Sequence, residues 1–215
     1  MAFSFPRVYP ILDSAFIPAV GRAEFLDTLG KSFAGNGATL LEYRNKTGAD
    51  AELLADAEIL RRALPETKLI LDDRADLVAQ TGFDGVHVDT GDISVTEARK
   101  LLGPDRIIGT YGGPADDYFM LLTGILSQPA DYFAIGPVFA TTTKQTSKPP
   151  IGIDGVRELR FQAGPSTILT AAAGITLETA PHVIAAGATT VAVAAAIFRA
   201  EDPAREFLRW KQTLG

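Results

Sequence analysis

The chain has 215 residues, 47% of them apolar, a formal net charge of −6 and no cysteine. The acidic balance argues against a nucleic-acid or anionic-membrane partner, and the lack of cysteine excludes disulfides and cysteine metal sites. The first residues lack a signal-peptide pattern, and the longest apolar run, 191–198, is too short to cross a bilayer. We therefore expect a cytoplasmic protein without a nucleic-acid or membrane partner.

Short apolar runs alternate with amphipathic segments along the whole chain. The expected strands are residues 8–13, 39–45, 68–73, 85–89, 106–111, 131–138, 167–173 and 190–197. The expected helices are residues 24–34, 51–64, 75–80, 95–102, 116–126, 156–161, 177–186 and 204–214. Ser94 and Glu97 have the spacing of a capping box at the start of one helix. Eight strand–helix units without a linker predict parallel pairing and a single (β/α)8 TIM barrel domain over residues 1–215.

The second expected strand carries three charges two residues apart, on Glu42, Arg44 and Lys46. Side chains two apart in a strand point to the same face, so these three should lie together. Three charges cannot all be buried without partners. They therefore form an ion network inside the barrel or line its mouth, where barrel enzymes keep their chemistry.

Carboxylates follow the third and fourth expected strands. Asp72 and Asp73 end the third, and Asp92 lies just beyond the fourth. Oxygen ligands from neighbouring loops suit Mg²⁺, usually with a diphosphate that completes its coordination. Alternatively, Asp72 or Asp73 caps the next helix. His87 lies among valines in the fourth strand, which favours a packed core histidine over a ligand or base.

The loop at 136–152 combines hydroxyls, lysines, glycines and prolines, and it includes Thr141, Thr143 and Lys144. This composition suits an anion-binding lid, although a polar surface connection is the alternative. Small residues follow at Ala173, Gly174 and Ala195. Small residues at helix starts allow phosphate to approach free backbone amides in the last two loops of a barrel, but they also serve tight packing.

The chain resembles the thiamine phosphate synthase family over nearly its whole length. The motifs that carry the resemblance are Tyr-Arg-Asn-Lys at 43–46, Asp-Asp-Arg at 72–74, Asp-Gly-Val-His at 84–87, Gly-Asp at 91–92, Gly-Pro-Val-Phe at 136–139 with Thr-Lys at 143–144, Ala-Gly-Ile-Thr at 173–176 and Ala-Ala-Ile-Phe at 195–198. The resemblance implies a Mg²⁺-dependent transferase that joins a pyrimidine methyl diphosphate to a thiazole phosphate and releases diphosphate. Its partners would be these phosphorylated small molecules, and the chain could form a homo-oligomer.

The resemblance also implies roles for individual residues. Arg44, Lys46 and Lys144 would hold the diphosphate and promote its departure, while Asp73 and Asp92 would bind Mg²⁺. Thr141 and Thr143 would contact the thiazole phosphate.

Five further substrate-binding positions depart from the family pattern. Glu42 stands for a glutamine that reads the pyrimidine, Asp72 for an asparagine, Tyr111 for a serine at the diphosphate, Ala173 for one of two glycines and Ala195 for a serine near the thiazole phosphate. Asp72 would repel the diphosphate unless it binds metal, stays protonated or points away from Asp73, as strand alternation would allow. A diverged non-catalytic phosphate-ligand binder or altered-substrate relative, and a thiazole tautomerase, are the alternative functions.

Overall fold

The computed structural model describes residues 3–89, 91–112, 123–124, 126–141 and 149–215. Its strands are all parallel, and each pairs with the next until β8 pairs with β1, which closes a barrel. The strands are β1 (Val8–Asp13), β2 (Leu40–Arg44), β3 (Lys68–Asp72), β4 (Gly85–Val88), β5 (Ile107–Tyr111), β6 (Tyr132–Ile135), β7 (Leu169–Ala172) and β8 (Thr190–Val193). The predicted (β/α)8 barrel is confirmed.

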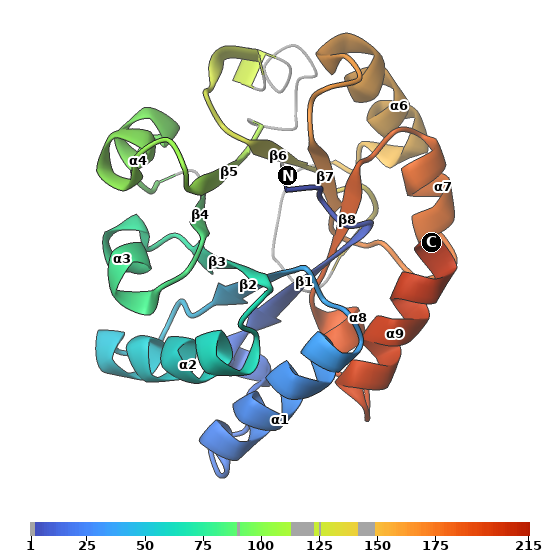
Figure 1. The fold of residues 1–215 in the computed structure, drawn as a ribbon. Coiled ribbons are helices and arrows are strands. Elements are labelled where there is room, and N and C mark those ends of the chain that lie inside the picture. The colour runs from blue at the N-terminus through green and yellow to red at the C-terminus, as the bar shows by residue number, and fades with distance from the viewer. Residues whose placement is uncertain (1–2, 90, 113–122, 125, 142–148) are drawn as a thin grey trace.

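Helices surround the barrel on its outside (Figure 1). They are α1 (Arg22–Gly35), α2 (Asp50–Ala63), α3 (Val78–Thr81), α4 (Val95–Leu102), α6 (Gly152–Ala163), α7 (Ala180–Ala185), α8 (Ala195–Phe198) and α9 (Pro203–Leu214), with 3-10 turns η1 (Ser14–Phe16) and η2 (Ala75–Leu77). Most of the helix expected at 116–126 lies outside the described residues. The capping box at Ser94 is confirmed, because its side chain accepts from the Glu97 amide and the Glu97 carboxyl accepts from the Ser94 amide.

The sequence prediction was wrong about the end of the eighth strand. The strand stops at Val193, and the residues from Ala195 form the short helix α8. β-branched Val191 and Val193 favour a strand, whereas the following alanines are the best helix formers.

A small cluster of apolar side chains fills the barrel interior, apart from the larger core that the helices cover. It consists of Tyr9, Leu40, Ile70 and Tyr132, with Phe5 packed against the Tyr132 ring at a centroid distance of 5.2 Å. These residues alternate along their strands with those of the outer core, as the pleat of a barrel requires. Aromatic residues of the N-terminal segment therefore pack against one end of the interior.

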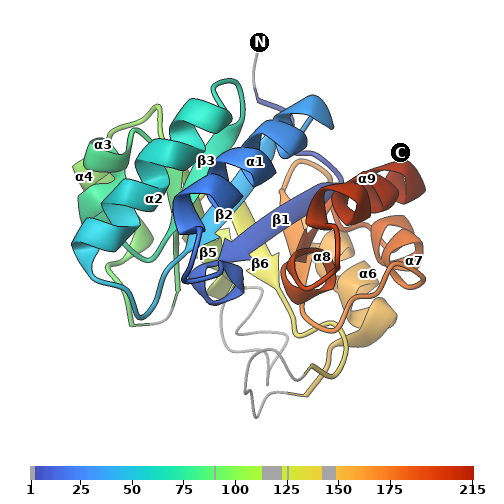
Figure 2. The same ribbon diagram turned by 90° about the horizontal axis from the view of Figure 1, so that it is seen from below.

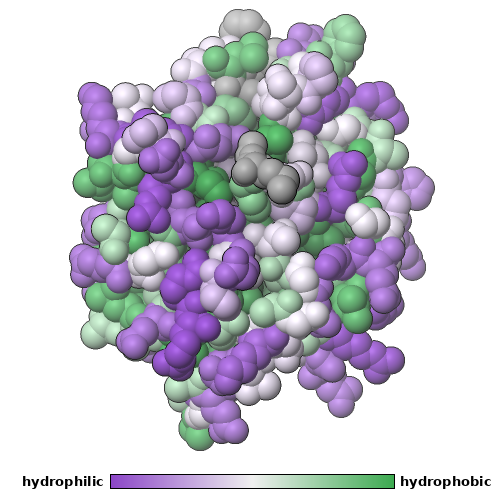
Figure 3. Space-filling model, in the orientation of Figure 1, coloured by the Kyte–Doolittle hydropathy of each residue, from purple (hydrophilic) through white to green (hydrophobic). Residues whose placement is uncertain are grey.

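The opposite end of the barrel is where the strands finish. Figure 2 shows β1 running away from the marked N-terminus, so the carboxyl ends of all eight parallel strands lie at the far end. Figures 1 and 3 view the molecule from the end at which the strands begin. There, hydrophilic residues are spread over the surface with only small hydrophobic patches between them (Figure 3). Within the described ranges, none of the helices has the length and hydropathy needed to cross a membrane.

Candidate active site

Arg44 lies at the mouth of the barrel between two carboxylates from the neighbouring strands. Its Nη1 contacts Oδ2 of Asp13 at the end of β1, and its Nε is 3.2 Å from Oδ2 of Asp72 at the end of β3. The Arg44 side chain keeps 35% of its surface exposed. The register of the three strands therefore builds a charged cluster at their carboxyl ends, where barrel enzymes carry their chemistry.

Lys46 joins this cluster from the loop after β2. Its Nζ contacts Oδ2 of Asp73 and lies 3.4 Å from Oδ2 of Asp72. Burial lowers the pKa of Lys46, but the two carboxylates outweigh it, so that the pKa is raised and the ammonium form is stabilised. The charged residues of the second strand were expected either to form an ion network inside the barrel or to line its mouth. Both interpretations hold in part, because Glu42 is buried inside the barrel, and Arg44 and Lys46 line the mouth as paired ions.

The loop that carries Lys46 is folded around Asn45. Asn45 Oδ1 accepts from the Gly48 amide at 2.7 Å, and its Nδ2 donates to Tyr43 Oη and to Glu52 Oε1, both at 3.1 Å. On the outer side of β2, the buried Tyr43 hydroxyl in turn donates to Asp56. Alternate residues of the 43–46 motif thus serve two tasks. Tyr43 and Asn45 anchor the loop, whereas Arg44 and Lys46 place positive charges in the mouth.

Asp72 and Asp73 do not face opposite sides, contrary to what strand alternation would allow. β3 ends at Asp72, and Asp73 has a φ of 65° in the left-handed region, which turns its carboxyl towards the same lysine. Neither carboxyl caps η2, because the residue before η2 is Arg74 and no side chain caps that turn. Asp72 therefore faces the candidate diphosphate site. Burial, followed by the charge of Asp73, raises the pKa of Asp72 to about 6, which favours the protonated form relative to an ordinary aspartate.

Asp73 and Asp92 form the candidate metal site. Asp92 Oδ2 accepts from the Asp89 amide at 2.8 Å, which fixes this carboxyl beyond β4. Burial raises the pKa of Asp92, and the neighbouring Asp73 adds to that effect. Oδ1 of Asp73 is buried and has no hydrogen-bond partner within the described part of the chain. Two crowded carboxylates with an unpartnered oxygen suit a hard divalent cation.

These two carboxylates would not enclose a cation alone. Among the described residues, no group of three or more His, Cys, Asp or Glu side chains is arranged to hold a metal ion. Mg²⁺ commonly uses one or two carboxylates and takes its other ligands from water and substrate phosphates. The residues present therefore fit Mg²⁺ that binds together with a diphosphate.

Glu42 lies deeper in the barrel, beneath the charged cluster. Only 4% of its surface is exposed, and its Oε2 accepts a hydrogen bond from Tyr9. The Tyr9 and Tyr132 hydroxyls are 2.8 Å apart, and the Tyr132 hydroxyl is 3.1 Å from Nδ1 of His87. Burial, followed by the charge of Asp72, raises the pKa of Glu42 to about 8. His87 is a packed, hydrogen-bonded residue, as predicted, and its ring stacks on Tyr132.

The other side of the mouth is formed by loops that are hydrogen-bonded to one another. Tyr111 Oη donates to the Gly136 carbonyl at 2.8 Å, so it holds the start of the loop after β6. The Phe139 amide donates to the Ala173 carbonyl at 3.1 Å, which joins this loop to the loop after β7. A Cβ on Gly174 would lie 2.5 Å from the Ala140 carbonyl oxygen, so only glycine fits there. Ala173 itself has a left-handed φ of 70°.

The remaining predicted residues are only partly covered by the structure. Thr141 is half-buried at the end of the described stretch of its loop, and Ala195 begins α8. Thr143 and Lys144 lie outside the described residues. The structure thus brings Arg44, Lys46, Asp72, Asp73 and Asp92 into one cluster and Tyr111, Ala173 and Gly174 into a second set of joined loops.

Two residues of the site were missed from the sequence. Asp13 ends the first strand. Because polar residues at the carboxyl ends of barrel strands are candidates for the active site, the same rule that indicated Arg44 and Asp73 also indicates Asp13. No local sequence signal could have identified Tyr9, because only the folded barrel brings its hydroxyl to Glu42.

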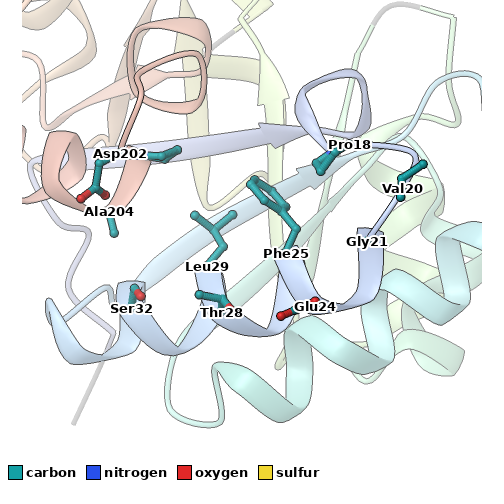
Figure 4. A pocket seen from close by; sticks show the side chains of 11 residues that line it. Pro18, Val20, Gly21, Glu24, Phe25, Thr28, Leu29, Ser32, Asp202 and Ala204 are labelled. Carbon is teal, nitrogen blue, oxygen red and sulfur yellow. The ribbon is translucent and has the colours of Figure 1, made fainter.

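A pocket of about 420 Å³ lies away from this cluster, on the outside of the barrel. It lies between α1 and the start of α9, with Phe25 and Leu29 pointing into it beside Pro18 (Figure 4). None of the predicted site residues lines it. The cavity is therefore separate from the charged mouth.

Comparison with known proteins identifies the family. The thiamine monophosphate synthase family matches residues 8–197. The chain belongs to the thiamine monophosphate synthase family. A thiamine-phosphate synthase of Koribacter versatilis is 40% identical over 208 residues, which is 95% of each chain. One of Agrobacterium fabrum is 41% identical over 183 residues, 82% of this chain and 81% of the relative.

A solved structure supports the fold of this thiamine monophosphate synthase family member. Thiamine phosphate pyrophosphorylase from Pyrococcus furiosus superposes with a TM-score of 0.79 at 24% identity, covering 97% of this chain and 95% of that one. The family and the transferase class predicted from the sequence are confirmed.

Proposed function

We propose that the chain joins hydroxymethylpyrimidine diphosphate to thiazole phosphate and releases diphosphate. The observation that carries the proposal is the cluster of Arg44 and Lys46 with Asp72 and Asp73 at the barrel mouth of a thiamine monophosphate synthase family member. Two cations and an unpartnered carboxylate oxygen on adjacent strands match the charge of a diphosphate bound with a divalent cation.

The chemistry needs charge stabilisation and positioning. The bond between the pyrimidine methylene carbon and the diphosphate oxygen breaks, and its electron pair leaves with the diphosphate. Arg44, Lys46 and Lys144 meet the developing negative charge, while the amino group of the pyrimidine stabilises the methylene cation. The thiazole nitrogen then donates its lone pair to form the new carbon–nitrogen bond. Because no proton must be removed for that bond, the protein needs to orient the two substrates and exclude water.

Asp73 and Asp92 would hold Mg²⁺ against the diphosphate. When bound, this ion neutralises charge on the leaving group. Glu42 would contact the pyrimidine from the barrel interior. Tyr111 would contact the diphosphate from the end of β5. The joined loops would take the thiazole phosphate at Thr141, Thr143, Ala173, Gly174 and Ala195, in the region that binds phosphate in many barrels.

A second function, a non-catalytic phosphate-ligand binder or altered-substrate relative, is favoured by one observation. Asp72 lies against both cations of the mouth, 3.2 Å from Arg44 Nε and 3.4 Å from Lys46 Nζ. Such a carboxylate competes with a phosphate for the same donors. A tautomerase has less support, because the two histidines of the sequence lie in β4 and α7 rather than after β5.

The test is product formation from the two substrates, with Mg²⁺ and with a chelator. We expect thiamine phosphate that requires Mg²⁺ and that is lost in Asp92→Ala and in Lys144→Ala. Asp27→Asn, a change at a surface pair with Lys31, serves as the matched control and should leave the rate unchanged. A folded protein that binds either substrate without forming product would instead establish the binder.

We also propose that residues 1–215 form one domain in the cytoplasm. The pairing of β1 with β8 and the packing of α9 against α1 support a single folding unit. The acidic net charge of −6 supports the absence of a nucleic-acid partner. We further propose that the chain forms a homo-oligomer, and sedimentation of the purified protein would test this.

A further inference from the structure

Asp13 is the last residue of β1, and it faces the last residue of β2 across the parallel pair. The register pairs Asp13 directly with Arg44, and Asp13 Oδ2 contacts Arg44 Nη1. The Asp13 side chain is only 17% exposed. This carboxylate therefore meets the arginine under partial burial, where charge-assisted hydrogen bonds are stronger than in open water.

The Asp13 carboxylate is itself held by the backbone. Its Oδ1 accepts a 2.9 Å hydrogen bond from the amide of Ala15, so it caps the turn η1. One oxygen is thus tied to β1 and η1 while the other contacts Arg44. The orientation of the guanidinium is consequently set by the backbone of the neighbouring strand rather than by a freely rotating side chain.

The opposite side of Arg44 is bounded by Asp72, 3.2 Å from Nε. A guanidinium is planar and carries five N–H donors. Among the described residues, the guanidinium donates a hydrogen bond to Asp13 from Nη1, whereas the Nε–Asp72 contact is an ion pair without hydrogen-bond geometry and Nη2 makes no hydrogen bond. Asp13 thus supplies the directional contact that orients the group, and Nε and Nη2 keep N–H donors for an external anion.

We propose that Asp13 is a positioning residue that holds Arg44 in the orientation in which it receives the diphosphate. This inference rests on the proposed function. A free arginine loses side-chain entropy when it binds a ligand, and prior orientation removes part of that cost. If Asp13 were only a competing anion, its neutralisation would strengthen diphosphate binding, so the two roles predict opposite signs.

A double-mutant cycle with Asp13→Asn and Arg44→Gln tests the proposal. Calorimetry would measure the affinity for Mg²⁺-pyrophosphate, and steady-state kinetics the kcat/KM for the pyrimidine diphosphate. We expect Asp13→Asn to weaken both about tenfold when Arg44 is present and about twofold or less in Arg44→Gln, because coupled residues are not additive. Asparagine can still cap η1, so Asp13→Asn should stay folded with only a small loss of melting temperature from the missing ion pair, and Asp27→Asn should leave both readouts unchanged.

Other outcomes would overturn the inference. Equal losses in both backgrounds would show that Asp13 acts independently of Arg44, and tighter pyrophosphate binding would show that it is a competitor. If the wild-type protein neither binds pyrophosphate nor forms product, the proposed function fails and the inference fails with it. If the wild-type protein is active and Asp13→Asn has the same pyrophosphate affinity and kcat/KM, the proposed function stands and the positioning role of Asp13 is wrong.

Discussion

The hydroxyl of Tyr9 donates a 2.8 Å hydrogen bond to Oε2 of Glu42 inside the barrel. Burial and the nearby charge of Asp72 raise the pKa of Glu42 to about 8, so the neutral acid dominates at neutral pH. A neutral carboxyl offers one O–H donor and an acceptor oxygen, whereas a carboxylate only accepts. A glutamine amide also offers both. Protonated Glu42 can therefore offer a donor and an acceptor, as the glutamine expected at this position in the family would.

The stability of the ligand-free protein should depend on the protonation of Glu42. An unfolded glutamate loses its proton near pH ~4.3, whereas folded Glu42 keeps it up to about pH 8. Between these values the unfolded state binds fewer protons, so the free energy of unfolding falls as pH rises. Asp72, with a pKa of about 6, also loses protons at the lower end of the range from pH 6 to 8, so the comparison of the wild-type protein with Glu42→Gln isolates the contribution of Glu42. Urea denaturation should show that Glu42→Gln removes about 1–2 kcal/mol of the loss over that range. Parallel curves for the two proteins would contradict the protonated buried acid.

The affinity for the pyrimidine should fall when Glu42 ionises. We expect the KM for the pyrimidine diphosphate to rise above pH 8 in the wild-type protein, since the carboxylate has lost its donor. In Glu42→Gln this alkaline rise should disappear, because an amide does not titrate. The measurement is KM for that substrate between pH 6 and 9.5, with the KM for the thiazole phosphate as an internal control. An alkaline rise of the same size in Glu42→Gln would assign it to another group.

Asp72→Asn should strengthen binding of Mg²⁺-pyrophosphate. The carboxylate lies 3.2 Å from Arg44 Nε and 3.4 Å from Lys46 Nζ, so its negative charge faces both cations. An asparagine of nearly the same shape removes this negative charge, so the affinity should rise about five- to tenfold. Titration calorimetry with and without Mg²⁺ measures the change. Weaker binding that is confined to the Mg²⁺ titration would instead show that Asp72 helps to hold the cation.

Gly109→Ala should destabilise the barrel. A Cβ at this position would lie 1.9 Å from Cζ of the buried Tyr132, whose ring fills the interior. Relief of the overlap would displace Tyr132 and its contact with Tyr9, at a cost of about 1–3 kcal/mol. Gly35→Ala is the matched control, because nothing lies within 4 Å of the added Cβ at the end of α1. Thermal unfolding should show a loss for the first change and none for the second, and equal effects would refute the steric argument.

The sequence predicted the barrel well because its signals are local. Apolar runs, turn glycines and the Ser94 capping box each depend on residues close together in the chain, and the eight strands lie where those signals placed them. The end of the eighth strand was predicted wrongly, because the run of valines and alanines that reaches Ala195 is compatible with a strand or a helix. The strand-end rule also found Arg44, Lys46 and Asp73, because parallel strands bring their carboxyl ends to one mouth.

The pairing of those charges could not be predicted in the same way. Asp13 and Arg44 are 31 positions apart, and only the register of β1 against β2 sets them opposite each other. The left-handed backbone of Asp73 turns its carboxyl to the lysine that Asp72 also faces, which no alternation rule anticipates. The chain's own residues thus determined the barrel, the family and the charges at its mouth. The tertiary structure decided which charges meet and how deeply Glu42 is buried, because contact and desolvation depend on segments that are distant in the chain.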